Sequence, residues 1–561
     1  MPVLPLPLGA FQPPKPENRI FRRYALDGHG YIFPCTAIIF HPQVWAKSLN
    51  SGFARICGTS KEPVVHPDRK EICRVTTESI DPQLRRNSLG LPELIFQSVT
   101  HIAPATNMVF TYPIIALKAG PDMPLSFLLA TTVCFFIGNT VAQFSRYMPS
   151  SGGYYSFATR GLGPRIGFMA TWSYLVYELL GGAGSSGFLG YLLSDTLRAG
   201  FGVHVPWWLI ALLTFAVIWT FTHYGVQLSV RITLFLGGLE LLIMLALATT
   251  FLIHPGPGSS YIAPLNPSAA PHHLGGVLAG MVFSILSLSG FEGSAPLAQE
   301  SRRAGKFVGQ AVLLSLVVTG LFYVSTSYAS AIGWGTGDMA AFAAHPNPYY
   351  ALGHKLWGMG WWFVVLALIN SAIGVGLATT NSASRVMYTM GQAGTLPSSF
   401  GRVHPVHQTP TFAIAMVQIV GIAAVLLVGL LLRPVYIFGL LETIATLAVI
   451  IIYCVANLAL TAYIRREHPE NFNIWHHVVS PWIGTLALLP VLFVTMYPEP
   501  EWPYNIAPYF LVVSLIAGFG YMQWLESRHP GALLRGATML VGSRSTSEGD
   551  VDWDKPIAPL S

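Results

Sequence analysis

Residues 284–300 read SILSLSGFEGSAPLAQE, an apolar run that places a carboxylate, Glu292, between Gly290 and Gly293 before the sequence turns polar. Glycine is a poor helix former and costs about 1 kcal/mol relative to alanine inside a helix. A charged side chain within a membrane segment is expensive and is usually functional. The stretch therefore predicts a helix that breaks across residues 289–293, beside a site that uses the break.

A second break is expected nearly two hundred residues earlier. Residues 102–106 read IAPAT, near the centre of the first apolar segment. Pro104 has no amide hydrogen and clashes with the preceding helical turn. Two interrupted helices at matching positions, five apolar segments apart, are typical of an inverted-repeat transporter with its site at the bilayer midplane.

The composition of the chain indicates a lipid environment. Only 10% of the 561 residues are charged and 52% are hydrophobic, whereas a soluble domain carries roughly 25% charged residues. Backbone polar groups cannot stay unpaired in hydrocarbon, and these segments are too long for barrel strands, so we expect an all-α membrane protein. The twelve expected spans cover residues 91–117, 124–147, 166–195, 205–223, 228–254, 276–299, 308–333, 358–391, 411–432, 435–463, 479–497 and 505–526.

Four regions follow from these spans. Residues 1–87 form a polar N-terminal tail, either disordered or the product of a start codon placed too far upstream. Residues 88–463 hold ten helices, residues 464–527 hold two more, and residues 528–561 form a polar C-terminal tail. The tails are too polar to bury a core and are expected to be disordered.

Basic residues are unevenly distributed between alternate loops, and the richer side is expected to be cytoplasmic. This places both termini in the cytoplasm and the protein in the cell membrane. The same asymmetry explains the net charge of +6 without a nucleic-acid partner. The richer loops contain Arg85, Arg86, Arg146, Arg160, Arg165, Arg302, Arg303, Lys306, Arg402, Arg465 and Arg466, and the poorer ones contain Lys118, Arg198, Lys355 and Arg433.

Three motifs in this order resemble those of the amino acid–polyamine–organocation (APC) superfamily of permeases, over most of residues 90–465. They are RYMPSSGGYY (146–155) with GLGP (161–164), GFEGSA (290–295) continuing to Gln299-Glu300, and NSASRVMY (381–388) with GTLP (394–397) and TP (409–410). The resemblance implies a LeuT-like fold with a 5+5 inverted repeat, discontinuous helices 1 and 6, and two peripheral helices.

The resemblance also implies secondary active transport of an amino acid by proton symport or exchange, with no cofactor. A polyamine or organic-cation transporter, and a transporter-like amino acid sensor, remain as alternatives. An enzyme is not expected, since the sequence lacks GxSxG and HExxH motifs. No metal site is predicted, and oligomeric state is left open.

The two breaks supply the expected substrate site. A broken helix exposes amides where its second half begins and carbonyls where its first half ends, which suit a carboxylate and an ammonium group. Pro104 offers no amide, unlike the glycine-rich runs of many relatives, and Phe291 is expected to cover the ligand. The candidate substrate-binding residues are Ala103, Pro104, Ala105, Thr106, Asn107, Ser287, Ser289, Gly290, Phe291 and Gly293.

Ionisable and polar residues at membrane depth are the candidates for coupling and gating. Glu240 stands where some relatives of the resembled family carry a lysine, so it is either a proton carrier or a protonated acid bonded to a neighbouring helix. Glu178 and Glu442 are expected mainly as interhelical hydrogen-bonding groups. The candidates for coupling or gating are Glu292, Glu240, Asn370, Ser371, Arg385 and His101.

Overall fold

The computed structural model describes residues 22–26, 32–36, 83–345, 347–496 and 502–542, and it divides the chain into two units, 1–79 and 80–561. The first unit contains an antiparallel pair of strands, β1 (Arg22–Leu26) and β2 (Ile32–Thr36), with Arg22 opposite Thr36. The remainder of the predicted N-terminal tail up to residue 82 lies outside the described residues.

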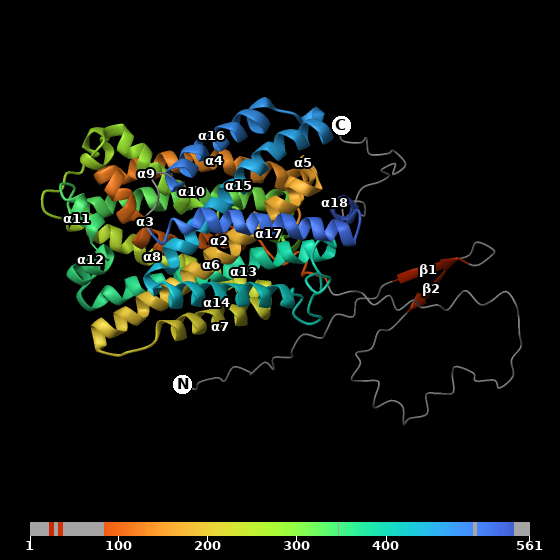
Figure 1. Cartoon of the computed structure of the whole chain (residues 1–561), viewed down its shortest axis with the longest axis horizontal. Coiled ribbons are helices and arrows are strands. Elements are labelled where there is room, and N and C mark those ends of the chain that lie inside the picture. The colour runs from red at the N-terminus through yellow and green to blue at the C-terminus, as the bar shows by residue number, and fades with distance from the viewer. Residues whose placement is uncertain (1–21, 27–31, 37–82, 346, 497–501, 543–561) are drawn as a thin grey trace, which may run out of the picture. The chain divides into compact units, whose positions relative to one another are not determined.

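The second unit is helical in its described residues, and its long helices pack side by side (Figure 1). Its α-helices are α2 (Leu91–Ile102), α3 (Pro104–Ala119), α4 (Met123–Tyr147), α5 (Tyr154–Leu162), α6 (Pro164–Phe201), α7 (Trp207–His223), α8 (Val226–Ile253), α9 (His273–Leu288), α10 (Ala304–Trp334), α11 (Met339–Ala344), α12 (Pro348–Trp357), α13 (Trp362–Gln392), α14 (Thr411–Leu431), α15 (Ile437–Glu467), α16 (Ser480–Met496), α17 (Ile506–Arg528) and α18 (Ala532–Gly542). Shorter helical turns are η2 (Gly120–Asp122), η3 (Ala263–Leu265), η4 (Pro267–Ala269), η5 (Ala295–Glu300), η6 (Gly358–Trp361), η7 (Pro434–Tyr436), η8 (Pro469–Asn471) and η9 (Trp475–Val479).

Length and apolarity identify this unit as a multi-pass membrane protein. Within the described residues, eight helical stretches are long and apolar enough to cross a bilayer. Two shorter apolar helices, α7 and α9, accompany them. The predicted number of twelve crossings and the inverted repeat stay predictions.

The first predicted break is present at Ala103. α2 ends at Ile102, Ala103 adopts a left-handed conformation with φ 55° and ψ 63°, and Pro104 begins α3. The left-handed region costs an L-residue roughly 1–2 kcal/mol, while proline suits the first position of a helix because its missing amide hydrogen has no partner there. The chain therefore stops one helix and starts another within a single residue.

The second predicted break is present between Leu288, where α9 ends, and Ala295, where η5 begins. Gly290 has φ 105°, a conformation that favours glycine. A Cβ at Gly290 would lie 2.9 Å from the His101 carbonyl carbon, and one at Gly293 would overlap the His101 ring. Both glycines are thus needed for the second break to pack against the end of α2.

Part of the predicted C-terminal tail is helical. α18 packs against α5, α6 and α17. The carboxylate of Glu526 accepts hydrogen bonds from the amides of Gly531 at 3.0 Å and Leu533 at 2.9 Å, which stabilises the turn into the helix. Residues 543–561 lie outside the described residues.

Two adjacent glycines in α8 test how closely this helix must approach α2. A Cβ at Gly237 would lie 2.7 Å from Thr100 and 3.0 Å from Phe96, whereas one at Gly238 would meet nothing within 4 Å. We expect Gly237→Ala to destabilise the protein by about 1–3 kcal/mol through overpacking and Gly238→Ala to leave it unchanged or slightly stabilised. Thermal unfolding of both purified variants measures the difference, and equal melting temperatures would contradict the close α2–α8 contact.

Candidate functional site

A small polar cavity lies between the two breaks. Its volume is about 20 Å³, which is room for roughly one water molecule. It is closed to anything larger, so a substrate requires the surrounding helices to move. Its lining residues come from both broken helices and from α6, α13 and α15, and they are His101, Ile102, Ala103, Asn107, Tyr177, Gly181, Ser185, Leu286, Ser289, Val375, Thr379, Phe438 and Glu442.

Four of the predicted site residues line this cavity, namely His101, Ala103, Asn107 and Ser289. The other predicted residues do not line it, and they are Pro104, Ala105, Thr106, Ser287, Gly290, Phe291, Gly293, Glu240, Glu292, Asn370, Ser371 and Arg385. The structure therefore brings the two breaks together, but most of the predicted site residues do not line the cavity between them.

The sequence did not assign to the site the cavity-lining residues on α6, α13 and α15. Their spacing along each helix could have indicated them. Residues four apart lie on one face of a helix. The lining pairs follow that spacing on each helix, namely Tyr177 with Gly181 and Ser185, Val375 with Thr379, and Phe438 with Glu442. Each set combines a polar or small residue with an apolar one on a single face.

Asn107 connects the two breaks. Its side-chain amide donates to the Ile102 carbonyl at the end of α2, and to the Ser287 carbonyl near the end of α9 at 3.1 Å. The Tyr323 hydroxyl donates to the same Ser287 carbonyl at 3.2 Å. The carbonyl expected to receive a substrate ammonium at Ser287 is therefore engaged by protein groups.

The amides at the start of α3 are also engaged. The Ala105 amide donates to Glu240 Oε1 at 2.5 Å, and the Thr106 amide donates to Ser371 Oγ at 3.2 Å. A helix N-terminus attracts negative charge, so Glu240 occupies the position that the sequence predicted for a substrate carboxylate. Glu240 is fully buried, and its second oxygen, Oε2, has no hydrogen-bond partner among the described residues.

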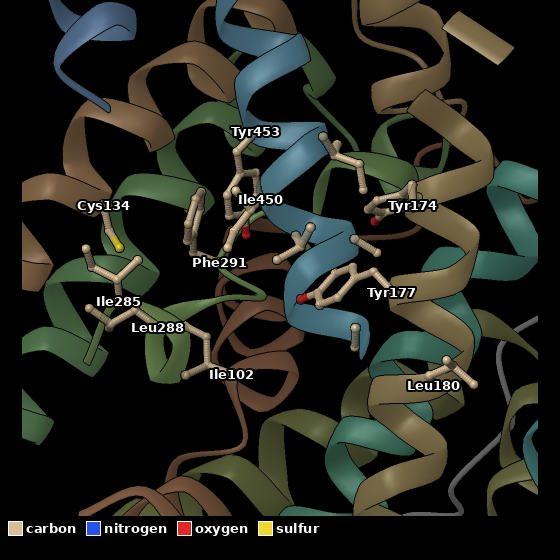
Figure 2. Close-up of a cluster of buried hydrophobic side chains, with 14 of the residues drawn as sticks. Ile102, Cys134, Tyr174, Tyr177, Leu180, Ile285, Leu288, Phe291, Ile450 and Tyr453 are labelled. Carbon is tan, nitrogen blue, oxygen red and sulfur yellow. The ribbon is translucent and has the colours of Figure 1, made fainter. Parts of the chain in front are cut away.

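Phe291 packs away from the cavity. Its ring stacks on Tyr453 with centroids 5.4 Å apart, and the Tyr453 hydroxyl donates to Glu292 Oε2 at 2.8 Å. Figure 2 shows Phe291 beside Tyr453 of α15, with Tyr177 on α6. The aromatic rings that line the cavity are Tyr177 and Phe438. The role of Phe291 as a cover over the ligand stays a prediction.

One acidic side chain lines the cavity, and a second contacts a lining residue. Glu442 lines it, and its Oε2 lies 3.7 Å from where a Cβ on Gly181 would be, so the glycine leaves space beside the carboxylate. Glu178 Oε2 lies 3.3 Å from His101 Nε2, and the Tyr177 ring stacks on the His101 ring at 5.8 Å. His101, which lines the cavity, is therefore paired with the carboxylate of Glu178.

A buried ion pair joins the end of the second broken helix to α13. Arg385 Nε lies 3.1 Å from Glu300 Oε2, and neither side chain is exposed to solvent. Beside the pair, the Ser88 amide donates to the Glu300 carbonyl at 2.8 Å, and the Arg302 amide donates to the Leu89 carbonyl at 2.9 Å. The start of the first broken helix and the end of the second are thereby joined.

Asn370 lies on α13, the helix that carries Arg385, and is buried, with its side-chain nitrogen unpartnered among the described residues. Nearer Arg385, Ser382 Oγ donates to the Gly293 carbonyl at 3.1 Å, and Gln97 Nε2 donates to the Ala378 carbonyl at 3.0 Å. α13 is thus tied to both broken helices, and the gating role of Arg385 stays a prediction.

Removing one partner of the buried pair should be costly. We expect Arg385→Met to destabilise the protein by about 3–5 kcal/mol, because Glu300 stays buried without its cation. The double variant Arg385→Met/Glu300→Gln should recover part of that loss. Arg160→Met is the matched control, since its partner Glu467 is 24% exposed and a partly exposed pair contributes about 1 kcal/mol or less. Denaturant unfolding of the three variants measures these differences, and equal losses for Arg385→Met and Arg160→Met would contradict the role of burial.

Comparison with known proteins places this chain among membrane permeases. The branched-chain amino acid permease BcaP of Bacillus subtilis is 28% identical over 399 residues, which cover 68% of this chain and 82% of the relative. The low-affinity putrescine importer PlaP of Escherichia coli is 23% identical over 351 residues, covering 61% and 75%. The L-asparagine permease of Escherichia coli is 24% identical over 442 residues, covering 74% and 84%. Residues 93–520 match the amino acid permease family, and the chain therefore belongs to this family of the APC superfamily.

Proposed function

We propose that this chain is a secondary active transporter that moves an amino acid across the cell membrane by alternating access, coupled to protons. The observation that carries the proposal is the polar cavity enclosed between two broken helices and lined by Ser289, His101 and Glu442. Sites of this kind, at interrupted helices, are typical of inverted-repeat transporters. The family relationship supports the same class of function.

The architecture that goes with this proposal has twelve membrane crossings. A 5+5 inverted repeat comprises the segments from α2 to α15 within residues 88–463, and α16 and α17 cross the membrane outside it. The excess of basic residues in alternate loops supports cytoplasmic termini.

The ammonium group of the substrate is proposed to bind beside Glu442 in the cavity. Glu442, Ser289 and Thr379 are among the residues that line the cavity. An ammonium group needs oxygen acceptors, and a carboxylate is the strongest acceptor available.

The carboxylate of an amino acid has a competitor within the protein. Glu240 already accepts the Ala105 amide at the positive end of α3. We propose that protonation of Glu240 weakens this bond, because a neutral acid is a poorer partner for a helix N-terminus than a carboxylate. The freed amide would then receive the substrate carboxylate. Proton binding and substrate binding would favour one another, as symport requires.

A second candidate is the transport of an amine that has no carboxylate. The same Glu240–Ala105 contact supports it, because an internal carboxylate can stand in place of the one that such a substrate lacks. Glu442 at the cavity and Glu178 beside it also suit a cationic ligand. One relative, PlaP, is named as a putrescine importer.

Uptake into proteoliposomes tests both candidates with matched compounds. Each amino acid is paired with its decarboxylated amine, such as ornithine with putrescine and lysine with cadaverine, with and without a pH gradient. Uptake of the amino acids alone, driven by the gradient, supports the first candidate, and uptake of the amines alone supports the second. Binding without uptake of any compound would instead indicate a sensor, and neither binding nor uptake would refute both candidates.

The coupling role of Glu240 predicts a specific defect. Glu240→Gln keeps an oxygen that accepts from the Ala105 amide but removes the titrating group. We expect substrate binding to persist while uptake loses its dependence on the pH gradient. Glu470→Gln is the control, because the Glu470 side chain is 64% exposed. Gradient dependence that matches the wild type in Glu240→Gln would remove this residue from the coupling step.

The cavity lining predicts which phenylalanine contacts the substrate. We expect Phe438→Ala to weaken substrate binding about tenfold or more, since loss of a buried aromatic contact costs more than 1 kcal/mol. Phe291→Ala should mainly lower the melting temperature, because its ring packs on Tyr453 and its loss leaves a cavity costing about 3–5 kcal/mol. Substrate titration and thermal unfolding of both variants separate the two roles. The reverse pattern would restore Phe291 as the cover over the ligand.

A further inference from the structure

Three histidines meet at one end of the helices, away from the cavity. His223 is the last residue of α7, while His404 and His407 lie between α13 and α14. One ring nitrogen from each lies within 4.8 Å of the others, and all three side chains are partly exposed. The group joins segments about 180 residues apart in sequence, and the sequence predicted no metal site here.

The loop that carries two of these histidines is held in a fixed shape. The His404 amide donates to the Thr409 carbonyl and the Gln408 amide donates to the His404 carbonyl, both at 2.9 Å. Thr409, which is fully buried, donates through Oγ1 to the His223 carbonyl at 3.0 Å. The loop is therefore anchored directly to the end of α7, beside the third histidine.

The ring positions suit a shared ion. The His404 and His407 rings lie 4.7 Å apart, and each lies 5.4–5.7 Å from the His223 ring. Three imidazole nitrogens bound to zinc at about 2.0–2.1 Å in a tetrahedral arrangement lie roughly 3.3 Å apart. Small rotations of these partly exposed side chains close the difference. The C-terminal end of a helix also carries partial negative charge, which favours a cation beside His223.

His404 is the ligand that must adjust. Its Nδ1 accepts hydrogen bonds from the amides of Val406 and His407, both at 3.2 Å. Binding through Nε2 moves the ring proton to Nδ1, so these two long bonds are lost. Water replaces them readily at this surface, where Val406 is 76% exposed. The rearrangement lowers the affinity but does not block the site.

We propose that His223, His404 and His407 form a binding site for a divalent transition-metal ion of the zinc class. Imidazole nitrogens favour zinc, copper, nickel and cobalt ions, whereas magnesium and calcium require oxygen ligands. Three protein ligands leave a fourth position for water. The bound ion would cross-link the end of α7 to the α13–α14 loop.

Metal titration of the full chain tests this site independently of transport. The protein is purified in detergent without a polyhistidine tag, stripped with a chelator and titrated calorimetrically with zinc chloride, with magnesium chloride as the unreactive ion. We expect one zinc ion per chain at this site, and a higher melting temperature in its presence. Cobalt should give the visible absorption of tetrahedral coordination.

Single substitutions locate the ion. His404→Ala and His407→Ala should each weaken zinc binding at least about tenfold, since even partners outside the coordination shell contribute that much. His272→Ala is the control, because His272 is an exposed histidine in a separate loop. Absence of saturable zinc binding, or equal zinc affinity in His407→Ala and the wild type, would overturn the proposal.

Discussion

The structure depends on one constraint, namely that a helix broken within a membrane must find new partners for the peptide groups it frees. At the first break these partners are the side chains of Glu240 and Ser371, which accept from the amides of Ala105 and Thr106. Asn107 then donates to carbonyls at the ends of both α2 and α9. Each break is thereby stabilised partly by the other, and the close approach of the two defines where the cavity can form.

The positions of both breaks could be predicted from the sequence because they are local properties. Pro104 cannot continue a helix, and Gly290 provides a backbone conformation that favours glycine. The need for glycine at position 293 could not be predicted. It arises because a side chain there would overlap the ring of His101, a residue on another helix. Hydropathy likewise identifies a membrane protein without showing which faces of the helices meet.

Contacts within the candidate site could not be predicted, for the same reason. The sequence identifies donors and acceptors near a break but not which of them the protein itself occupies. Phe291 and Glu292 were assigned to the ligand and to coupling, yet both contact Tyr453, about 160 residues further along the chain. The face of α6 that carries Tyr177, Gly181 and Ser185 was visible as a spacing of four, but similar spacings occur on every helix.

A carboxylate of the protein at the proposed binding position, Glu240, also affects the affinity expected for the substrate. A hydrogen bond to a charged group contributes about 1.5–3 kcal/mol. A substrate carboxylate that takes the Ala105 amide from protonated Glu240 gains part of this energy, but once Glu240 loses its proton two carboxylates compete for one amide and the net gain is small. Release then costs little, because Glu240 is present to reclaim the amide. Under the proposed mechanism, selectivity must come from the contacts of the substrate ammonium and side chain with Glu442 and Phe438. The Ala105 amide of α3 couples substrate binding to protonation of Glu240.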